Sequence, residues 1–191
     1  MKRHIYLFRH GTTVDNSAGK FSGWRQAPLN KRGEDDAKIV ALRLKDKKID
    51  VAFQSRLIRS KETLKVVLKP HPECKLVVTD NRIIERSYGE LQGKTHFQYI
   101  KNNSPQKYDK FHRGYNVSPP GGESIKDVEK RVKLFIKDLI KMIKENKVNV
   151  AVSAHGNSMR PFRRYFEKMS IKEMMLIENP YDNYFEYSID V

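Results

Sequence analysis

The sequence predicts an α/β protein, a three-layer sandwich in which helices flank a mostly parallel central sheet. Short apolar runs alternate along the chain with longer segments whose apolar residues recur at helical spacing, as they do in β-α-β units. Two of the apolar runs end alike, one in RHG and the other in AHG. No repeat, low-complexity segment or Gly/Ser linker divides the 191 residues, so we expect one domain over residues 1–191.

Each expected element rests on a local pattern. Apolar runs of strand length predict strands at 5–8, 51–54, 75–78 and 148–154, with a last one at 184–191. Apolar residues at helical spacing predict helices at 30–46, 56–68, 123–146 and 157–168. The longest of these helices has one apolar face, formed by Ile125, Val128, Val132, Phe135, Leu139 and Met142.

The composition restricts the partners. The formal net charge of +15 attracts polyanions, but the repeated lysines of 126–147 are interpreted as the solvated face of a helix. Because the chain has no RNP-type, zinc or glycine-clamp motif, we expect no nucleic-acid partner. No apolar segment approaches membrane-spanning length, and the single cysteine, Cys74, fits a reducing compartment. We therefore expect a cytoplasmic protein without a membrane partner, and a homo-oligomer is compatible with the sequence.

The two similar strand ends predict a site. The runs YLF and VAVSA both continue into His-Gly, at His10 and His155. Parallel sheets bind ligands beyond the carboxyl ends of their strands, and glycine lets a backbone turn tightly and approach a ligand closely. We therefore expect His10 and His155 to face each other across the rim of one pocket.

A third segment adds positive charge to the same edge. QSRLIRSKET (54–63) follows a predicted strand and opens a helix, which places Arg59 one turn into that helix, near its positive end. An anion would be stabilised there. Taken alone, Arg59 would be interpreted as a solvent-facing helix arginine.

Four motifs occur in a defined order: RHGTTVDN (9–16), SRLIRSKET (55–63), ERSYGELQGK (85–94) and AHGNSMR (154–160). With these motifs the chain resembles the histidine phosphatase superfamily. FSGW (21–24), GELQG, FHRGYNVSPP (111–120) and HGNS make it most similar to the cofactor-dependent phosphoglycerate mutases. The resemblance extends from about residue 5 to about residue 168, and it implies one phosphoglycerate mutase-like catalytic domain.

The resemblance implies that His10 is the nucleophile and becomes a phosphohistidine. Arg9, Arg59 and His155 would bind the phosphoryl group, a role that suits the planar fork of arginine. Nearby cations disfavour a protonated imidazole, so His10 would stay neutral and nucleophilic at about pH 7. Glu85 would protonate the leaving oxygen and then activate the next acceptor as a base. No metal is implied, and the spacings of His, Asp and Glu show no metal-ligand cluster.

The substrate implied by the resemblance is a small phosphorylated molecule. Six residues would bind it by similarity: Asn16, Ser22 and Gly23 at the phosphate, Tyr88 and Arg113 at a carboxylate or second phosphate, and Asn157 beside His155. For each of them the alternative is a polar loop residue that only ties down a turn. Trp24 is interpreted as a structural anchor of its loop.

The chain also departs from the mutase pattern. Thr12 stands where many mutases carry an acidic residue, and His96 and His112 stand where they carry a lysine and an arginine. Titratable imidazoles would weaken anion binding and make it depend on pH. PPGGES (119–124) replaces a longer insertion, and the chain ends at Val191 without the usual C-terminal tail that helps to close the site. A less closed site admits water.

Three functions remain open at this point. The favoured one is interconversion of 3-phosphoglycerate and 2-phosphoglycerate, with 2,3-bisphosphoglycerate as the primer that keeps His10 phosphorylated. The first alternative is a phosphomonoesterase, broad or directed at sugar phosphates, in which water replaces the substrate hydroxyl as the acceptor. The second alternative is a non-enzymatic polyanion-binding protein, and the complete catalytic set argues against it.

Overall fold

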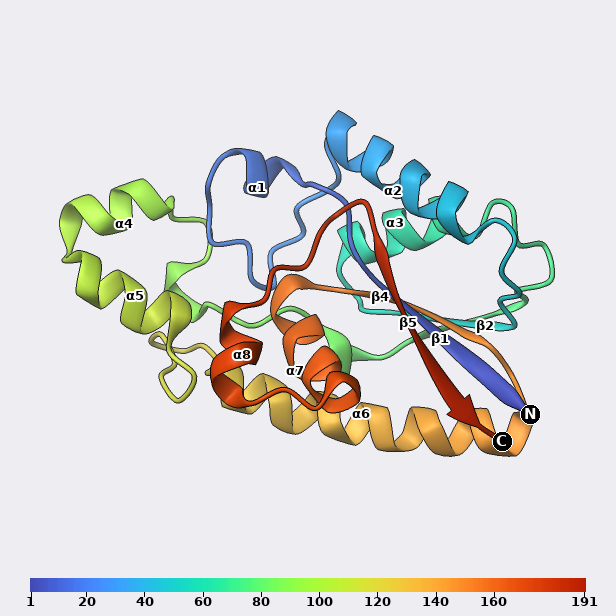
Figure 1. Ribbon diagram of the computed structural model, residues 1–191. Coiled ribbons are helices and arrows are strands. Elements are labelled where there is room, and N and C mark those ends of the chain that lie inside the picture. The colour runs from blue at the N-terminus through green and yellow to red at the C-terminus, as the bar shows by residue number, and fades with distance from the viewer.

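Five strands form the central sheet, in the order β3-β2-β4-β1-β5 (Figure 1). The computed structural model describes residues 1–191, with the exception of the side chain of Arg113. The strands are β1 (Lys2–Arg9), β2 (Val51–Gln54), β3 (Leu76–Thr79), β4 (Val150–Ala154) and β5 (Tyr184–Asp190). Strands β1 to β4 run parallel, and β5 pairs antiparallel to β1. The predicted mostly parallel sheet is therefore confirmed.

Helices cover both faces of this sheet, as the three-layer prediction requires (Figure 1). One face carries α2 (Lys31–Leu44) and α3 (Ile58–Val67), and the other carries α6 (Ile125–Asn146) and α7 (Gly156–Glu167). Successive side chains of β1 point to opposite faces. Ile5 and Leu7 pack with α6 and α7. Tyr6 and Phe8 pack with α2 and α3, so β1 is buried on both sides.

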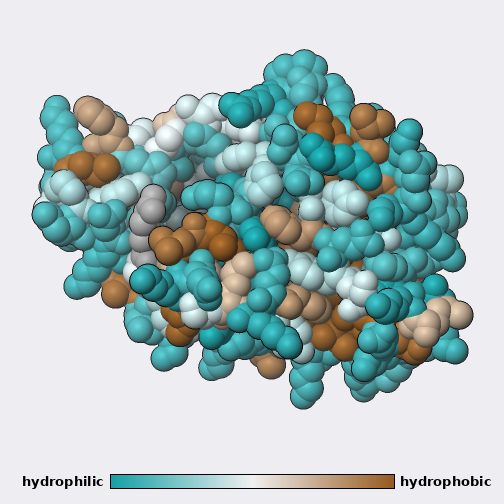
Figure 2. Space-filling view, viewed as in Figure 1, coloured by the Kyte–Doolittle hydropathy of each residue, from teal (hydrophilic) through white to brown (hydrophobic). Residues whose placement is uncertain are grey.

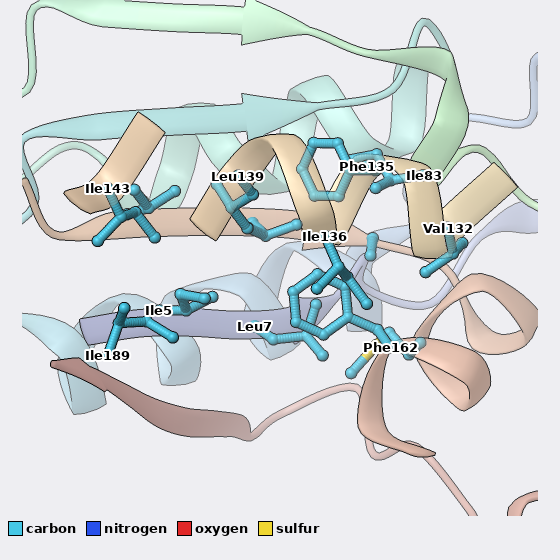
Figure 3. Packing of buried hydrophobic residues seen from close by; sticks show 14 of the residues in the cluster. Ile5, Leu7, Ile83, Val132, Phe135, Ile136, Leu139, Ile143, Phe162 and Ile189 are labelled. Atoms are coloured by element: carbon cyan, nitrogen blue, oxygen red, sulfur yellow. The ribbon is translucent and has the colours of Figure 1, made fainter. Parts of the chain in front are cut away.

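The longest helix supplies much of the larger core cluster. Figure 3 shows side chains of α6 directed at β1, at β5 and at Phe162 of α7. The helix starts after Ser124, whose hydroxyl accepts from the N–H of Asp127 while the Asp127 carboxylate accepts from the N–H of Ser124. Ile143 is fully buried, whereas Met142, which the sequence placed on the apolar face, is only half-buried. Each fully buried aliphatic side chain contributes roughly 1.5–3 kcal/mol, so this face holds the helix on the sheet.

Several short helices were not expected from the sequence. They are α1 (Val14–Ser17), α4 (His96–Asn102), α5 (Pro105–Arg113) and α8 (Ile171–Leu176), together with 3₁₀ turns at Asn81–Ile83 and Gly89–Leu91. In Figure 1, α4 and α5 lie to the side of the sheet rather than on either face of it. They pack through a small aromatic cluster centred on Phe21. Because this small cluster is separate from the sheet core, α4 and α5 need only a few apolar residues to pack on it and lack the long apolar stripe that predicts a helix.

The exterior is mostly hydrophilic on the face shown in Figure 2, where hydrophobic residues gather in small separate areas. The lysines along α6 are exposed, as expected for a solvated face: Lys126, Lys130, Lys133, Lys137, Lys141 and Lys144. Within the part of the chain that the structure describes, no helix has both the length and the apolar character needed to cross a bilayer.

Candidate active site

Two strand ends bring the predicted histidines together. β1 and β4 are neighbours in parallel register, with Arg9 paired to Ala154. His10 and His155 follow directly, and the backbone N–H of His10 donates to the carbonyl oxygen of Ala154 at 3.0 Å. The two imidazole centroids lie 5.0 Å apart. Two segments that are distant in the sequence therefore meet at one point, beyond the carboxyl edge of the sheet.

The ring of His10 is buried, and its two hydrogen bonds define one tautomer. Nδ1 lies 2.8 Å from the carbonyl oxygen of Gly11, which can only accept, so Nδ1 carries the hydrogen. Nε2 then offers a lone pair, and it accepts a bond from Nε of Arg59 at 3.2 Å. Burial and the charges of Arg59 and Arg9 lower the pKa of His10 well below its ordinary value of 6.5. The ring is therefore neutral, which is the nucleophilic form.

His155 is held in place through its other nitrogen. The hydroxyl of Ser55 accepts from the N–H of Leu57 at 3.2 Å, so its own hydrogen is available to Nε2 of His155, 2.7 Å away. Burial and the charge of Arg59 lower the pKa of His155 well below 6.5, so this ring is neutral too and Nδ1 carries its hydrogen. Nδ1 is buried without a hydrogen-bond partner among the described residues. It is a donor available to a ligand.

Arg59 is a buried cation and not a solvent-facing helix residue. It is the second residue of α3, which begins at Ile58, and it is 1% exposed. Nη1 donates to the carbonyl of Arg25 at 2.9 Å, and Nη2 donates to the carbonyl of Gly23 at 2.7 Å. These bonds compensate for the loss of water around the charge. Burial lowers the pKa of Arg59 to about 10, so the group remains charged at neutral pH.

Glu85 reaches the same site from the segment that follows the first 3₁₀ turn. Its Oε1 accepts from the backbone N–H of Arg86 at 2.8 Å and from that of Asn157 at 3.1 Å. Asn157 lies in the first turn of α7, and the positive end of a helix stabilises a carboxylate. The carbonyl of Glu85 accepts from Nε1 of Trp24 at 2.7 Å. Trp24 thereby ties its own loop to the segment that carries the acid.

A cavity of about 230 Å³ adjoins these groups: Glu85 lines it, whereas His10, Arg59 and His155 are buried and are not among its lining residues. Its lining comes from several parts of the chain: Arg9, Asn16, Lys20, Phe21, Ser22, Gly23, Glu85, Tyr88, His96, His112, Gly156, Asn157, Arg160, Met175, Glu178 and Asn179. Cationic, amide and aromatic groups outnumber the two acids, Glu85 and Glu178. The cavity is therefore suited to a small anionic molecule rather than to an apolar one.

Three buried polar atoms at the site have no hydrogen-bond partner within the described part of the chain: Nε of Arg9, Oγ of Ser22 and Nδ1 of His155. Buried polar groups in proteins are normally satisfied, and an unsatisfied one costs roughly 1–3 kcal/mol. All three atoms can donate a hydrogen. Each of them is therefore a donor that an oxygen of a bound anion would satisfy.

Five of the six predicted substrate residues line the cavity: Asn16, Ser22, Gly23, Tyr88 and Asn157. The prediction for the Arg113 side chain lies outside the described residues. Nδ2 of Asn157 donates to the hydroxyl of Tyr88 at 3.4 Å, and the Tyr88 ring packs on Phe21. Tyr88 is thus a wall residue and a packed aromatic at once. Gly23 has a φ of 48°, which favours glycine, and its carbonyl holds Arg59.

The structure also reveals a possible metal-ligand set that the sequence spacing did not show. Ligand atoms of His10, Glu85 and His155 all lie within 4.8 Å of one another. The spacing concealed this set because its members come from three separate segments. The hydrogen bonds favour an anion over a cation here, since Nδ1 of His155 carries a hydrogen and the guanidinium of Arg59 already donates to the lone pair of His10.

A family model describing the histidine phosphatase superfamily (branch 1) matches residues 5–188. The chain belongs to this superfamily. The resemblance inferred from the four ordered motifs is confirmed, and the two histidines at the strand ends lie within the matched range.

Relatives by sequence within the superfamily include 2,3-bisphosphoglycerate-dependent phosphoglycerate mutases. The one from Chlamydia caviae is 32% identical over 202 residues, which cover 92% of this chain and 89% of the relative. The one from Mesorhizobium japonicum is 34% identical over 182 residues, which cover 93% and 88%. The one from Methanococcus vannielii is 30% identical over 218 residues, which cover 98% and 91%.

Solved structures with the same fold include proteins named as phosphatases. A mycobacterial glucosyl-3-phosphoglycerate phosphatase has a TM-score of 0.84 at 22% identity, covering 98% of this chain and 91% of that one. The α-ribazole phosphatase of Shigella flexneri has a TM-score of 0.82 at 21% identity, covering 98% and 90%. At these identities the likeness establishes the fold. The chain is therefore a histidine phosphatase superfamily enzyme, of mutase or phosphatase type.

Two departures from the mutase branch of the superfamily lie in the cavity wall. His96 and His112 both line it, with ring centroids 5.2 Å apart. Burial lowers the pKa of His96 below its ordinary value of 6.5, so this ring is neutral at pH 7. His96 therefore does not supply the permanent charge of the lysine that the mutases carry there.

Sequence reasoning missed the wall that the C-terminal segment contributes to this superfamily fold. Met175, Glu178 and Asn179 line the cavity, yet no motif marks them. The direction of the last strand was the usable signal. Because β5 is antiparallel, it begins where the parallel strands end, with Tyr184 paired to Phe8, so the segment before it must lie at the site. The expectation of a less closed site rests only on the lack of a tail after that strand, and it leaves out the segment before the strand, which lines the cavity.

Proposed function

We propose that this chain transfers phosphoryl groups through a phosphohistidine formed at Nε2 of His10. The observation that carries the proposal is the state of that ring, which is neutral, anchored on the backbone through Nδ1, and keeps on Nε2 a lone pair to which, among the described residues, only Nε of Arg59 donates. A nucleophile in this state needs no additional base before it attacks. The surrounding guanidinium groups would stabilise the charge that develops on the phosphoryl oxygens.

The transfer balances with the groups present. Nε2 of His10 forms a bond to phosphorus as the bond from phosphorus to the leaving oxygen breaks. Glu85, which takes up a proton when a phosphate dianion binds beside it, gives that proton to the leaving oxygen. Nε of Arg59 gives up its bond to Nε2 of His10 and donates to a phosphoryl oxygen, while Nη1 and Nη2 keep their carbonyl partners. Arg9 Nε and His155 Nδ1 supply further donors. In the second half, Glu85 takes the proton of the acceptor hydroxyl as the N–P bond breaks.

We infer that the acceptor is the hydroxyl of a bound phosphoglycerate, so that 3-phosphoglycerate and 2-phosphoglycerate are interconverted. The mutase relatives at 30–34% identity over most of the chain support this acceptor. Lys20 and Arg160 also line the cavity, and we assign the carboxylate of the glycerate to these two cations. The proposal includes 2,3-bisphosphoglycerate as the primer, because the cycle starts from a phosphorylated His10.

Hydrolysis of phosphomonoesters is the second candidate. The neutral imidazole of His96 in the cavity wall favours it, because a weaker hold on a second anionic group lets water compete for the phosphohistidine. Both candidates use the same first half-reaction. They differ only in what receives the phosphoryl group.

Labelling with ³²P-2,3-bisphosphoglycerate tests the proposal. We expect an acid-labile, base-stable phosphoprotein that passes its label to monophosphoglycerate, and no label on a His10→Gln variant. Release of inorganic phosphate without isomerisation would reject the mutase activity in favour of phosphomonoester hydrolysis. No phosphoprotein from either bisphosphoglycerate or a chromogenic phosphate ester would overturn both.

A further inference from the structure

The guanidinium of Arg9 is enclosed on its two flat faces. Cζ of Arg9 lies over the ring of Tyr181, 3.8 Å from the ring centroid, which is the separation expected when the two planar groups stack. The backbone of Gly156 lies against the group as well, since a Cβ built on Gly156 would be 3.3 Å from Cζ, 3.3 Å from Nη2 and 3.5 Å from Nε. Three nearly equal distances place that position above the guanidinium plane and not at its edge. No atom of Tyr181 is among the three nearest to that Cβ position, as it would be if the ring covered the same face, so the ring and Gly156 lie on opposite faces.

The edges of the same guanidinium are divided between the protein and the cavity. Nη1 donates to the carbonyl oxygen of Asn179 at 3.0 Å. Nε is buried and has no hydrogen-bond partner among the described residues, and Arg9 lines the cavity. The Nε and Nη2 edge is therefore the one able to form two parallel bonds to a phosphoryl group. The direction in which this edge points depends on the plane in which the guanidinium is held.

The segment that carries Tyr181 is itself fixed. Nδ2 of Asn179 donates to the carbonyl of Gly156 at 2.9 Å, and its Oδ1 accepts from Nη1 of Arg163 at 3.1 Å. Pro180 restricts the backbone between Asn179 and Tyr181. Three residues beyond Tyr181, β5 begins and pairs with β1. The ring is thus held between two anchored points and has an edge-on contact with His10, at 6.1 Å between centroids and an angle of 64°.

We propose that Tyr181 is a positioning residue, whose ring holds the guanidinium of Arg9 in the plane required to bind a phosphoryl group. The inference rests on the proposed phosphoryl transfer and adds a residue to it. The aromatic face attracts the cation, and Gly156 prevents the guanidinium from tilting away on the other side. Without the ring, Arg9 keeps its bond to Asn179 but can rotate out of the plane. The phosphoryl group would then lose a pair of donors that is correctly oriented before it binds.

Three variants separate this role from general packing. Tyr181→Phe keeps the aromatic face, and Tyr181→Leu keeps bulk over His10 but removes that face. Tyr184→Leu is the matched control, because Tyr184 begins β5 and packs edge-on against Tyr6, in the core on the α2 and α3 side. The measurements are the affinity for inorganic phosphate by calorimetry, the rate of His10 labelling and the melting temperature.

We expect Tyr181→Leu to lower both phosphate affinity and labelling rate by about 10-fold, with Tyr181→Phe and Tyr184→Leu within about 2-fold of the parent. Parent-like phosphate affinity in Tyr181→Leu would overturn the inference. So would equal losses in Tyr181→Phe or in Tyr184→Leu, since these would indicate the hydroxyl or general packing. If the parent binds phosphate but never becomes labelled, the proposed function fails while phosphate affinity still decides the role of Tyr181. If the parent does not bind phosphate, both fail.

Discussion

The two His-Gly strand ends lie side by side in the same register, yet their rings are anchored to the protein through opposite nitrogens. At the end of β1, Nδ1 of His10 is bound to a backbone carbonyl and Nε2 presents a lone pair. At the end of β4, Nε2 of His155 is bound to Ser55 and Nδ1 presents a hydrogen. One ring can accept phosphorus and the other can donate to an oxygen. The hydrogen-bond partner behind each ring, and not the shared dipeptide, sets its chemical role.

The glycines of the two His-Gly pairs, Gly11 and Gly156, also differ in what lies against them. A Cβ on Gly11 would lie 2.2 Å from the carbonyl oxygen of Gly33, so two backbone segments meet there. A Cβ on Gly156 would lie 3.3 Å from Cζ of Arg9, which is a side chain. The sequence suggested that both glycines admit a ligand. At Gly11 the close approach serves the packing of the chain against itself, whereas at Gly156 it serves a group of the site.

Removing the ring that presents a lone pair should have the largest effect. We expect His10→Gln to lower phosphoryl transfer by on the order of 10⁴-fold or more and to abolish the phosphoprotein, because glutamine offers no comparable nucleophile. Single-turnover labelling measures this directly. Labelling of His10→Gln at the parent rate would show that His10 is not the nucleophile, and the difference in role between the two rings would then be wrong.

Removing the ring that presents a hydrogen should cost less and leave the intermediate detectable. We expect His155→Ala to lower the labelling rate by roughly 10²–10³-fold, the usual loss for one donor to a developing negative charge. The phosphoprotein should still accumulate at long times, because His10 is unchanged. If His155→Ala and His10→Gln were equally inactive, the two rings would not have the separate roles assigned to them.

Changing the partner behind the second ring should have a smaller effect. Ser55→Ala removes the hydroxyl that donates to Nε2 of His155, so the ring is free to move its hydrogen from Nδ1 to Nε2. We expect a loss of about 10-fold in kcat/KM. Nitrogen NMR of the imidazole should show the hydrogen leaving Nδ1 of His155, with the signals of His10 unchanged. An unaltered His155 spectrum in Ser55→Ala would contradict the tautomer assignment.

The smallest expected effect concerns the pH dependence of stability. Both rings have a pKa well below 6.5 in the folded protein, because both are buried. Unfolding returns them to a pKa of about 6.5, so below that pH the unfolded chain binds more protons than the folded one. The free energy of unfolding should therefore fall as the pH is lowered from 7 to 5. It should fall less steeply in a His10→Gln/His155→Gln double variant, as urea midpoints would measure, and equal slopes would show that these rings do not contribute.

The strands and long helices were predictable because their signals are local. β2 matches the predicted strand at 51–54, and α6 lies within the predicted helix at 123–146. The helices α4 and α5 were missed because they pack on the small cluster around Phe21 and not on the sheet, so their sequences lack a sustained apolar face. Local patterns report burial against a large core better than contact with a small one.

The site was predictable as far as its motifs extended. The motifs located His10, His155, Arg59 and Glu85, but they could not show that Arg59 is buried, because its charge is satisfied by carbonyls of a loop more than 30 residues away in the sequence. Tyr181 carries no motif at all. Its place follows only from the antiparallel direction of β5, a property of the assembled sheet.

The cavity wall that ends at Asn179 continues through Tyr181 into β5, the strand at one edge of the sheet. At the opposite end of that strand, the amino group of Met1 donates to the carbonyl of Val191 at 3.3 Å. Edge strands fray before central ones, and fraying of β5 from either end would loosen the wall. A ligand that tightens Arg9 against this wall should therefore slow amide hydrogen exchange along the whole of β5, as far as the two chain termini.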